Sequence, residues 1–142
     1  MAITRNASTH WEGTLFEGAG QVTFESSALG THDVTWASRA EDPNGRTSPE
    51  ELIAAAHSTC YSMQLANTLV DAGTPATSLD TKAAVDFKPG TGITGIALVV
   101  TGVVPGATAE SFAAAAESAK ENCPVSQALK AVPITLEASL SE

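Results

Sequence analysis

The chain has 142 residues, which is enough for one domain with a sizeable hydrophobic core. Its formal charge is −9 and only seven residues are Lys or Arg, so binding to nucleic acid or to an anionic membrane is disfavoured. The sequence has neither a membrane-spanning apolar run nor the apolar core of a signal peptide, and we therefore expect a cytoplasmic protein.

Three strands are predicted in the N-terminal part of the chain. Apolar and polar residues alternate over residues 10–16 and 21–26, on either side of the turn-rich residues 17–20, and this pattern is typical of a hairpin. The alternation returns over residues 31–37, which predicts a third strand. Residues 38–47 are polar and include Pro, Asn and Gly, so they are expected to form an exposed loop.

A long helix is predicted from residue 48 to residue 73, and the other elements are expected to pack around it. Ser48 is a preferred N-cap, Pro49 suits the first helical position, and Glu51 stands where a capping box requires it. Gly73 can close the helix in a left-handed conformation. Because the segment is apolar over much of its circumference, we expect it to run through the middle of the fold or of a dimer.

A second hairpin and two helices are predicted after the long helix. The alternating residues 79–87 and 93–104 predict the two strands of the hairpin. Thr108 is expected to cap an alanine-rich helix. Because proline can begin a helix but cannot continue one, Cys123, which precedes Pro124, is expected at the start of a short helix that runs to residue 130.

Residues 134–140 predict a last strand. The order of three strands, a helix, two strands, two helices and a strand indicates an α+β fold with sheets covering the helices. The sequence shows no linker, internal repeat or low-complexity tract, and residues 1–142 are therefore expected to form a single domain.

Two cysteines, Cys60 and Cys123, are the candidates for chemistry. In a cytosolic chain such a pair favours a reactive or redox role over a structural disulfide. A cysteine reacts as a thiolate, which needs a helix N-terminus, a cation or a histidine nearby. Cys123 has a helix N-terminus by sequence, whereas Cys60 lies in the middle of a helix, where an inert core cysteine is the competing interpretation.

A reactive Cys60 therefore depends on a cation from another part of the chain. Arg39 and Arg46, both in the predicted loop before the long helix, are the candidates. A guanidinium can bond a thiolate and, through its forked donors, a carboxylate that holds it in place. Glu50 or Glu51, in the first turn of the helix, would supply that carboxylate.

Two segments of the chain resemble a known family. TSPEELIAAAHSTCYSMQL at residues 47–65 and ENCPVSQAL at residues 121–129 are similar to the osmotically inducible protein C family, relatives of the organic hydroperoxide resistance proteins. The resemblance covers nearly the whole chain, because the order of strands and helices also agrees. It implies that the chain is a thiol-dependent peroxidase.

The resemblance also implies roles for individual residues. Cys60 matches the peroxidatic cysteine and Cys123 matches the resolving one. Glu50 matches the carboxylate that anchors the catalytic arginine, and Arg39 matches that arginine in the osmotically inducible branch. This branch is favoured because the other is expected to place its arginine further toward the N-terminus. The loop between Arg39 and Glu50 is about one residue longer than expected, which leaves Arg46 as the alternative.

In the implied mechanism, Arg39 holds Cys60 as a thiolate, which attacks the peroxide O–O bond and becomes a sulfenic acid. Cys123 then condenses with the sulfenic acid to form a disulfide. An external dithiol, either a small molecule or a lipoylated protein, reopens this disulfide by thiol exchange. The chemistry needs no metal and no bound cofactor.

The spacing along the long helix adds an expectation about assembly. Glu50 and Cys60 are ten residues apart, which corresponds to about 15 Å along a straight helix. One arginine cannot easily contact both within a single chain. We therefore expect an intertwined homodimer with antiparallel sheets wrapped around long central helices. In it, Arg39 and Glu50 of one subunit complete the pocket around Cys60 of the other.

Two other functions are compatible with the same cysteines. A redox-sensing or binding module would use Cys60 and Cys123 to switch a surface without turnover. A metal site at His57 and Cys60 is a weaker candidate, because structural zinc needs four ligands. His57 is otherwise expected to pack against a carbonyl or a partner helix. The aromatic residues of the predicted N-terminal strands are expected to pack on the sheet or to line an apolar opening for alkyl peroxides.

Overall fold

The structure is a computed structural model, and it describes residues 1–141. The chain falls into two compact units, residues 1–52 and the part from residue 53 onward. The long helix α2 (Pro49–Asp71) begins in the first unit and continues in the second. Among the described residues, no helix has the length and apolar character needed to cross a membrane. The single-domain organisation stays a prediction.

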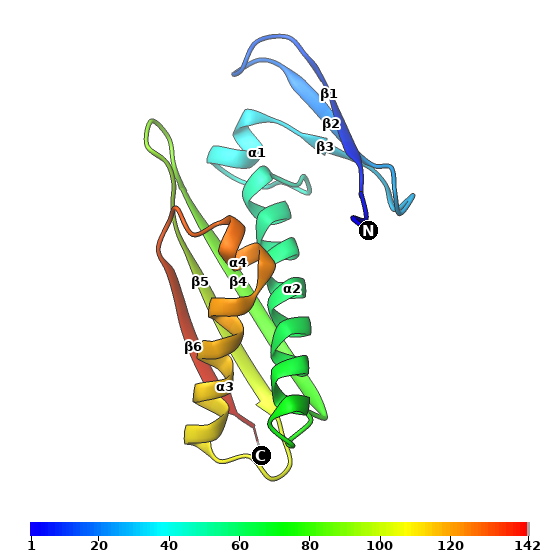
Figure 1. The fold of residues 1–142 in the computed structure, drawn as a ribbon. Coiled ribbons are helices and arrows are strands. Elements are labelled where there is room, and N and C mark those ends of the chain that lie inside the picture. Colours follow the sequence, from blue (N-terminus) through cyan, green and yellow to red (C-terminus); the bar gives the residue numbers. More distant parts are fainter. Residues whose placement is uncertain (142) are drawn as a thin grey trace. The chain divides into compact units, whose positions relative to one another are not determined.

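The first unit contains a three-stranded antiparallel sheet in the order β1-β2-β3 (Figure 1). Its strands are β1 (Ala7–Glu12), β2 (Ala19–Phe24) and β3 (Gly30–Val34). The predicted hairpin is confirmed, but its first strand lies earlier than residues 10–16, and residues 13–18 form the connection. Leu15 and Phe16, which extend the alternating pattern, lie in this connection with exposed side chains.

A short helix, α1 (Trp36–Ala40), follows the sheet where the sequence pattern predicts the end of a strand and a loop. Thr35 caps it. The Thr35 hydroxyl accepts a hydrogen bond from the Ser38 backbone N–H, and the Ser38 hydroxyl accepts one from the Thr35 N–H, each at 3.0 Å. This is a capping box with serine in place of the usual glutamate. The predicted element order therefore lacks one helix, and Arg39 lies in the last turn of α1.

The long helix has the predicted N-cap and the predicted glycine at its end, but the Glu51 carboxylate bonds the Thr47 hydroxyl, so the predicted capping box is not formed as expected. The Glu51 backbone N–H donates to the Ser48 hydroxyl at 3.2 Å, and Gly73 has a left-handed φ of +76° just beyond the last helical residue. Within the second unit the helix buries one stripe with a spacing of four residues, formed by His57, Tyr61, Leu65 and Leu69. Met63 and Val70, on another side of the helix, are exposed in the single chain. One chain therefore buries part of the helix circumference only.

The second unit contains a three-stranded sheet in the order β4-β5-β6. β4 (Ser78–Lys88) and β5 (Gly92–Val103) form the predicted antiparallel hairpin, and β6 (Ile134–Leu140) is the predicted last strand. The predicted antiparallel pairing holds for the first sheet and for β4 with β5, but β6 pairs in parallel with β5, so the second sheet is mixed. The reason is topological: helices connect β5 to β6, and such a crossover returns the chain in the same direction.

Two helices form the crossover between β5 and β6. α3 (Ala109–Asn122) has the predicted cap at Thr108, and α4 (Pro124–Ala128) follows the predicted N-cap Cys123 but ends before residue 130. Phe112 of α3 packs against the sheet at Gly102, where a Cβ would come within 2.9 Å of the Phe112 ring. A larger residue than glycine at position 102 would displace this ring.

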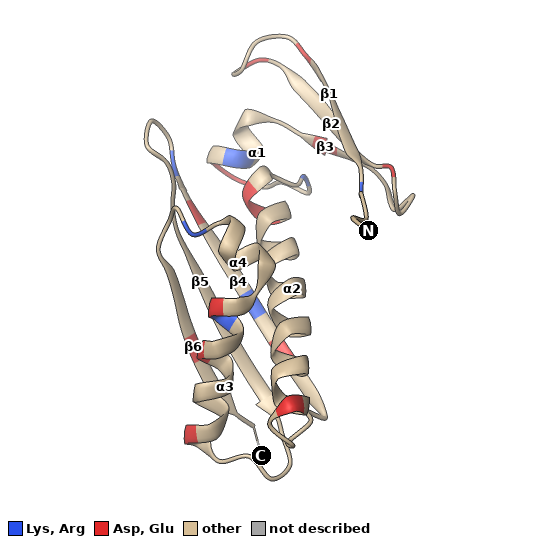
Figure 2. Cartoon of the chain, viewed as in Figure 1, with Lys and Arg blue, Asp and Glu red and all other residues tan. Residues whose placement is uncertain are grey.

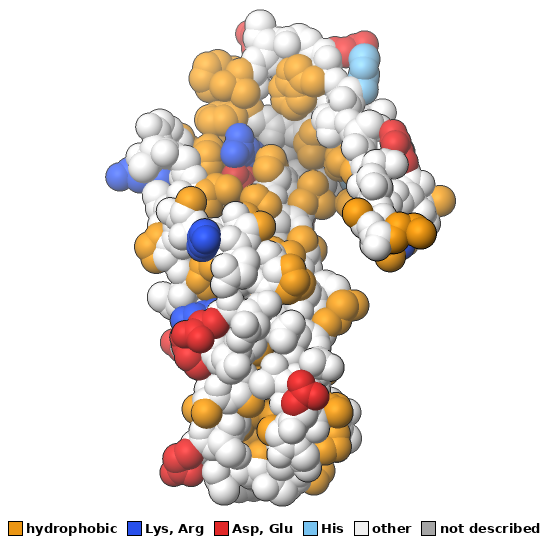
Figure 3. Space-filling view, in the orientation of Figure 1, with side chains coloured by type: hydrophobic (Ala, Val, Ile, Leu, Met, Phe, Trp, Pro, Cys, Tyr) orange, Lys and Arg blue, Asp and Glu red, His pale blue; other side chains and the backbone are white. Residues whose placement is uncertain are grey.

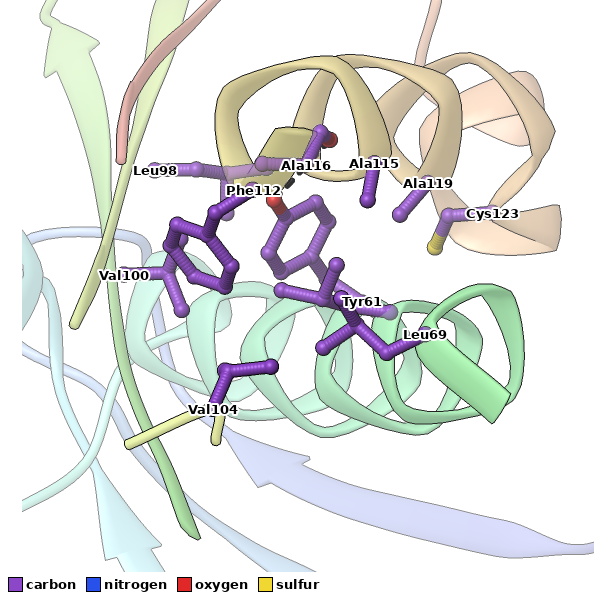
Figure 4. Close-up of a cluster of buried hydrophobic side chains, with 11 residues drawn as sticks. Tyr61, Leu69, Leu98, Val100, Val104, Phe112, Ala115, Ala116, Ala119 and Cys123 are labelled. Carbon is purple, nitrogen blue, oxygen red and sulfur yellow. Dashed lines mark hydrogen bonds between the residues drawn. The ribbon is translucent and has the colours of Figure 1, made fainter. Parts of the chain in front are cut away.

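The core of the second unit lies between α2, α3 and the sheet, as Figure 4 shows. It consists of Tyr61, Leu65, Leu69, Leu98, Val100, Val104, Phe112, three alanines of α3 and Cys123. The Tyr61 hydroxyl donates to the Ala116 carbonyl at 3.0 Å, so the one polar group of this ring is satisfied. One of the two candidate cysteines is therefore part of the packed interior.

Candidate active site

Cys60 and Cys123 lie together in the second unit. Cys60 is half-buried on α2, and Cys123 is completely buried at the start of α4, with its sulfur directed toward α2 in Figure 4. Both are free thiols. The Cys60 thiol is hydrogen-bonded to the Cys123 side chain and also accepts a hydrogen bond from the backbone N–H of Val125. The structure therefore brings the two predicted cysteines into direct contact.

The surroundings act on the Cys60 thiol in opposite directions. Burial raises the pKa of Cys60, the Val125 N–H lowers it, and the neighbouring Cys123 raises it through its hydrogen bond and its charge. The resulting pKa of Cys60 lies above the ordinary value for cysteine. Because the thiolate is the nucleophile, a reactive Cys60 needs positive charge beyond what this environment supplies.

The N-terminus of α4 serves Cys60 as well as Cys123, which sequence reasoning missed. Pro124 is the first helical residue and has no N–H, so Val125 carries the first amide that α4 can direct outward. That amide hydrogen-bonds the Cys60 sulfur. The Cys-Pro pair is the sequence signal for this helix start, but only the tertiary packing of α4 beside α2 makes Cys60 the acceptor.

His57 lies one turn before Cys60 on α2 and has no exposed surface. Its Nε2 shares a hydrogen bond of 2.7 Å with the hydroxyl of Ser126 in α4, instead of bonding a carbonyl or a partner helix as the sequence suggests. Burial lowers the pKa of His57. Nδ1 of His57 has no hydrogen-bond partner among the described residues. Within residues 1–141, no three His, Cys, Asp or Glu side chains gather to hold a metal ion.

Arg39 and Glu50 form an ion pair in the first unit. Arg39 Nη2 donates to Glu50 Oε1 at 2.8 Å, and Arg39 Nε donates to Oε1 and Oε2 at 3.0 and 3.2 Å. The Glu50 carboxylate is buried, whereas the Arg39 side chain keeps 30% of its surface exposed. Figure 2 shows the basic residue on α1 and the acidic residues at the start of α2. The planar, forked contact fixes the orientation of the guanidinium.

Glu51 and Arg46, the alternatives to Glu50 and Arg39, do not take part in this ion pair. Glu51 accepts a hydrogen bond from the Thr47 hydroxyl at 2.6 Å, so its carboxylate is engaged within its own turn of the chain. Arg46 is exposed in the loop before α2. Of the candidate pairs, the structure therefore joins Arg39 to Glu50.

A hollow of about 360 Å³ adjoins Arg39 within the first unit. Most of its lining is apolar, and the lining residues are Thr9, Trp11, Leu15, Val22, Val34, Thr35, Trp36, Arg39, Pro49 and Leu52. Figure 3 shows hydrophobic side chains on the surface of this part of the molecule. Two of the aromatic residues expected on the sheet, Trp11 and Trp36, thus line an apolar hollow beside Arg39.

The fold and the two contacting thiols define a candidate thiol-redox protein. Comparison with known families identifies the group to which the chain belongs. The family model described as OsmC-like protein matches residues 42–137, and the chain is a member of this family. The resemblance inferred from the motifs around Cys60 and Cys123 is confirmed.

Relatives and solved structures agree with this membership. The chain is 43% identical over 143 residues to "Peroxiredoxin OsmC" of Escherichia coli (strain K12), with 99% of each chain covered. An OsmC-like protein from Mycoplasma pneumoniae matches the structure with a TM-score of 0.75 at 10% identity, with 100% of both chains covered. An organic hydroperoxide resistance protein OsmC from Legionella pneumophila gives a TM-score of 0.70 at 22% identity, with 100% of this chain and 99% of that chain covered. The two structural matches confirm the α+β fold.

Proposed function

We propose that this chain is a cysteine-dependent peroxidase that reduces organic hydroperoxides. The observation that carries the proposal is the contact between Cys60 and Cys123, with the Val125 N–H on the Cys60 sulfur. Family membership supports it, since the relative from Escherichia coli is named a peroxiredoxin. Cys60 is the peroxidatic residue and Cys123 the resolving residue in this proposal.

The reaction begins when the Cys60 thiolate attacks the O–O bond of the hydroperoxide. A bond forms between sulfur and one oxygen, the O–O bond breaks, and the other oxygen leaves as an alcohol after it takes up a proton. Cys60 becomes a sulfenic acid, so the sulfur is oxidised by two electrons and the peroxide is reduced by two. Cys123 then attacks the Cys60 sulfur, water leaves, and a disulfide joins the two residues.

Arg39 is the residue that we propose to supply the missing positive charge. Burial raises the pKa of Cys60, and a guanidinium near the sulfur would counter this effect by stabilising the thiolate. The bidentate contact with Glu50 would hold the guanidinium in a fixed direction. Arg46, which has an exposed position, is the alternative that an experiment must separate from Arg39.

The helix spacing between Glu50 and Cys60 supports a homodimer in which each site combines two subunits. About 15 Å separates two residues ten positions apart on a straight helix, which is too far for one arginine to bridge easily. Met63 and Val70 on α2 are exposed in the single chain and suit burial against a second copy. Arg39 and Glu50 of one subunit would then act on Cys60 of the other.

The hollow beside Arg39 suits the alkyl part of an organic hydroperoxide, because its lining is mostly apolar while Arg39 offers a charged rim. An external dithiol, either a lipoyl group on a partner protein or a small thiol, would reopen the disulfide. The proposal requires neither a metal ion nor a bound cofactor, and it places the enzyme in the cytoplasm, where such dithiols are kept reduced.

Consumption of cumene hydroperoxide in the presence of a dithiol tests the proposal. The wild-type protein should turn over continuously, and Cys60→Ser should abolish turnover. Cys123→Ser should react once with peroxide and then gain further oxygen atoms on Cys60, which mass spectrometry of the intact protein detects. A wild-type protein that reacts once and stops in excess dithiol would indicate a redox switch without turnover.

A further inference from the structure

We propose that the hydrogen bond between His57 and Ser126 holds α4 in the position from which Cys123 resolves the sulfenic acid of Cys60. The inference deepens the proposed function and rests on it. It assigns His57 and Ser126 as positioning residues, because each acts through a cysteine that lies three residues away on its own helix.

The short helix α4 is held by few contacts besides this bond: Val125 packs partly buried against the core, and the Gln127 side chain donates to the Glu121 carbonyl of α3. It has five residues, and so short a helix is marginal in the absence of tertiary contacts. Its N-cap residue, Cys123, makes no side-chain capping hydrogen bond. Ser126 is the buried residue of this helix, so its buried anchor is a polar side chain instead of the usual apolar one.

His57, the hydrogen-bond partner of Ser126, is also buried. His57 has no exposed surface, and its Nε2 contacts the Ser126 hydroxyl at 2.7 Å. A directional bond between two buried side chains sets a distance and an angle, which apolar packing does not. Loss of the bond would leave buried polar groups without a partner on both helices, so the packed arrangement favours keeping it.

The position of the bond links it to the sulfur chemistry. His57 stands three residues before Cys60 on α2, and Ser126 stands three residues after Cys123. The turn of α2 that carries Cys60 also carries His57, and the start of α4 carries both Cys123 and Ser126. The hydrogen bond therefore joins the two helices at the place where the two thiols meet. A shift of α4 along α2 would move Cys123 away from Cys60.

This geometry matters most after the first oxidation. The sulfenic acid of Cys60 has two fates, and both start from the same intermediate. In one, the Cys123 sulfur attacks the Cys60 sulfur, a disulfide forms and water leaves. In the other, a second hydroperoxide oxidises the sulfenic acid to a sulfinic acid and is itself reduced to an alcohol. The ratio of the two products depends on how close α4 holds Cys123, and it does not depend on the rate of the first oxidation.

The experiment measures this ratio by mass spectrometry as a function of cumene hydroperoxide concentration. Ser126→Ala and His57→Leu should each lower, by about tenfold, the peroxide concentration at which half of the protein becomes sulfinic acid. The double variant should fall no further than either single variant, because both remove the same bond. His57→Gln, which keeps a hydrogen-bonding group at this position, should restore much of the wild-type ratio.

Tyr61→Phe is the matched control. Tyr61 lies on the same helix and its hydroxyl bonds the α3 carbonyl of Ala116, so its loss removes a buried hydrogen bond to α3 and keeps the bond between His57 and Ser126. This variant should lose stability but keep the wild-type product ratio. An unchanged ratio in Ser126→Ala, or an equal shift in Tyr61→Phe, would overturn the inference.

A second measurement separates this inference from the proposed peroxidase function. The equilibrium between the dithiol and the disulfide of Cys60 and Cys123 in glutathione buffers needs no peroxide. Ser126→Ala should weaken disulfide formation by about tenfold relative to wild type if the bond positions Cys123. Wild-type protein that forms the disulfide but consumes no peroxide would refute the proposed function alone, whereas an unchanged equilibrium in Ser126→Ala would refute the positioning role.

Discussion

The two units of the chain differ in how much apolar surface they bury. Among the described residues, Val22 is the one buried hydrophobic residue of the first unit, and every other lies beyond residue 53. The first unit instead buries the carboxylate of Glu50 and leaves the large apolar side chains Leu15, Phe16 and Leu29 exposed. A 52-residue unit with so little core is not expected to be stable unless another surface covers it.

The candidate functional residues are divided between the same two units. The first unit carries the charged pair of Arg39 and Glu50 beside an apolar hollow, and the second carries Cys60 and Cys123 in and beside a packed core. The two cysteines lie against a well-packed core, whereas Arg39 and Glu50 lie in a unit whose sheet has little core of its own. Variants that affect the two units differently therefore test this division.

The largest expected effect on stability is at Phe112 in the second unit. Phe112→Ala removes a ring that is 1% exposed and should lower the free energy of unfolding by about 3–5 kcal/mol. Phe16→Ala is the matched change in the first unit. The Phe16 ring is 74% exposed and lies edge to face with Trp36, with the two ring centroids 5.6 Å apart. The cost of Phe16→Ala should stay below about 1 kcal/mol. Urea unfolding at equal protein concentration compares the two, and equal costs would contradict the contrast between the units.

The next effect concerns the rate of peroxide reaction. Arg39→Lys keeps the charge but loses the planar fork that contacts Glu50, and the second-order rate constant of Cys60 oxidation should fall by about 100-fold. Arg46→Lys, the same change at the exposed arginine, should leave the rate constant within about twofold of wild type, as surface changes usually do. Stopped-flow measurement under single-turnover conditions distinguishes the two arginines.

Mixed dimers extend this test to the subunit arrangement. When Arg39→Lys and Cys60→Ser chains are refolded together, half of the random dimers should contain one complete site built from Arg39 of one chain and Cys60 of the other. Activity should then recover to roughly a quarter of wild type. A mixture as inactive as its components would contradict a site shared between subunits.

Local sequence signals predicted the helices and strands whose ends are chemically marked. Ser48, Pro49 and Gly73 mark the long helix, and Cys123 with Pro124 marks the start of α4, because caps and proline act within a few residues. These signals do not depend on where the rest of the chain lies. Both candidate cysteines could therefore be placed on their helices from sequence.

The misses have two physical causes. At α1 the alternation of Val34 and Trp36 continues the strand pattern, and the cap at Thr35 uses Ser38 where glutamate is the usual signal. The other misses are contacts between distant segments. The parallel pairing of β6 depends on the crossover, and the bond between His57 and Ser126 spans 69 positions. No local pattern specifies such a partner.

The smallest expected change in the free energy of unfolding comes from the titration of His57. Burial lowers its pKa in the folded protein, whereas the unfolded chain should titrate near the ordinary value of about 6.5. Above that pH both states are neutral and the folded state keeps its full stability. As the pH falls below about 6.5, the unfolded state gains a proton that the folded state does not, so the free energy of unfolding decreases.

Comparison of wild type with His57→Gln isolates this contribution, because the other titrating groups are common to both proteins. The wild-type free energy of unfolding should fall more steeply between pH 7 and pH 5.5, with an excess slope of at most about 1.4 kcal/mol per pH unit. Urea unfolding across this range measures it. The excess belongs to the second unit alone, since His57 and its partner Ser126 both lie there. Parallel pH profiles for the two proteins would mean that His57 is not held neutral by burial, and that its contact with Ser126 survives protonation.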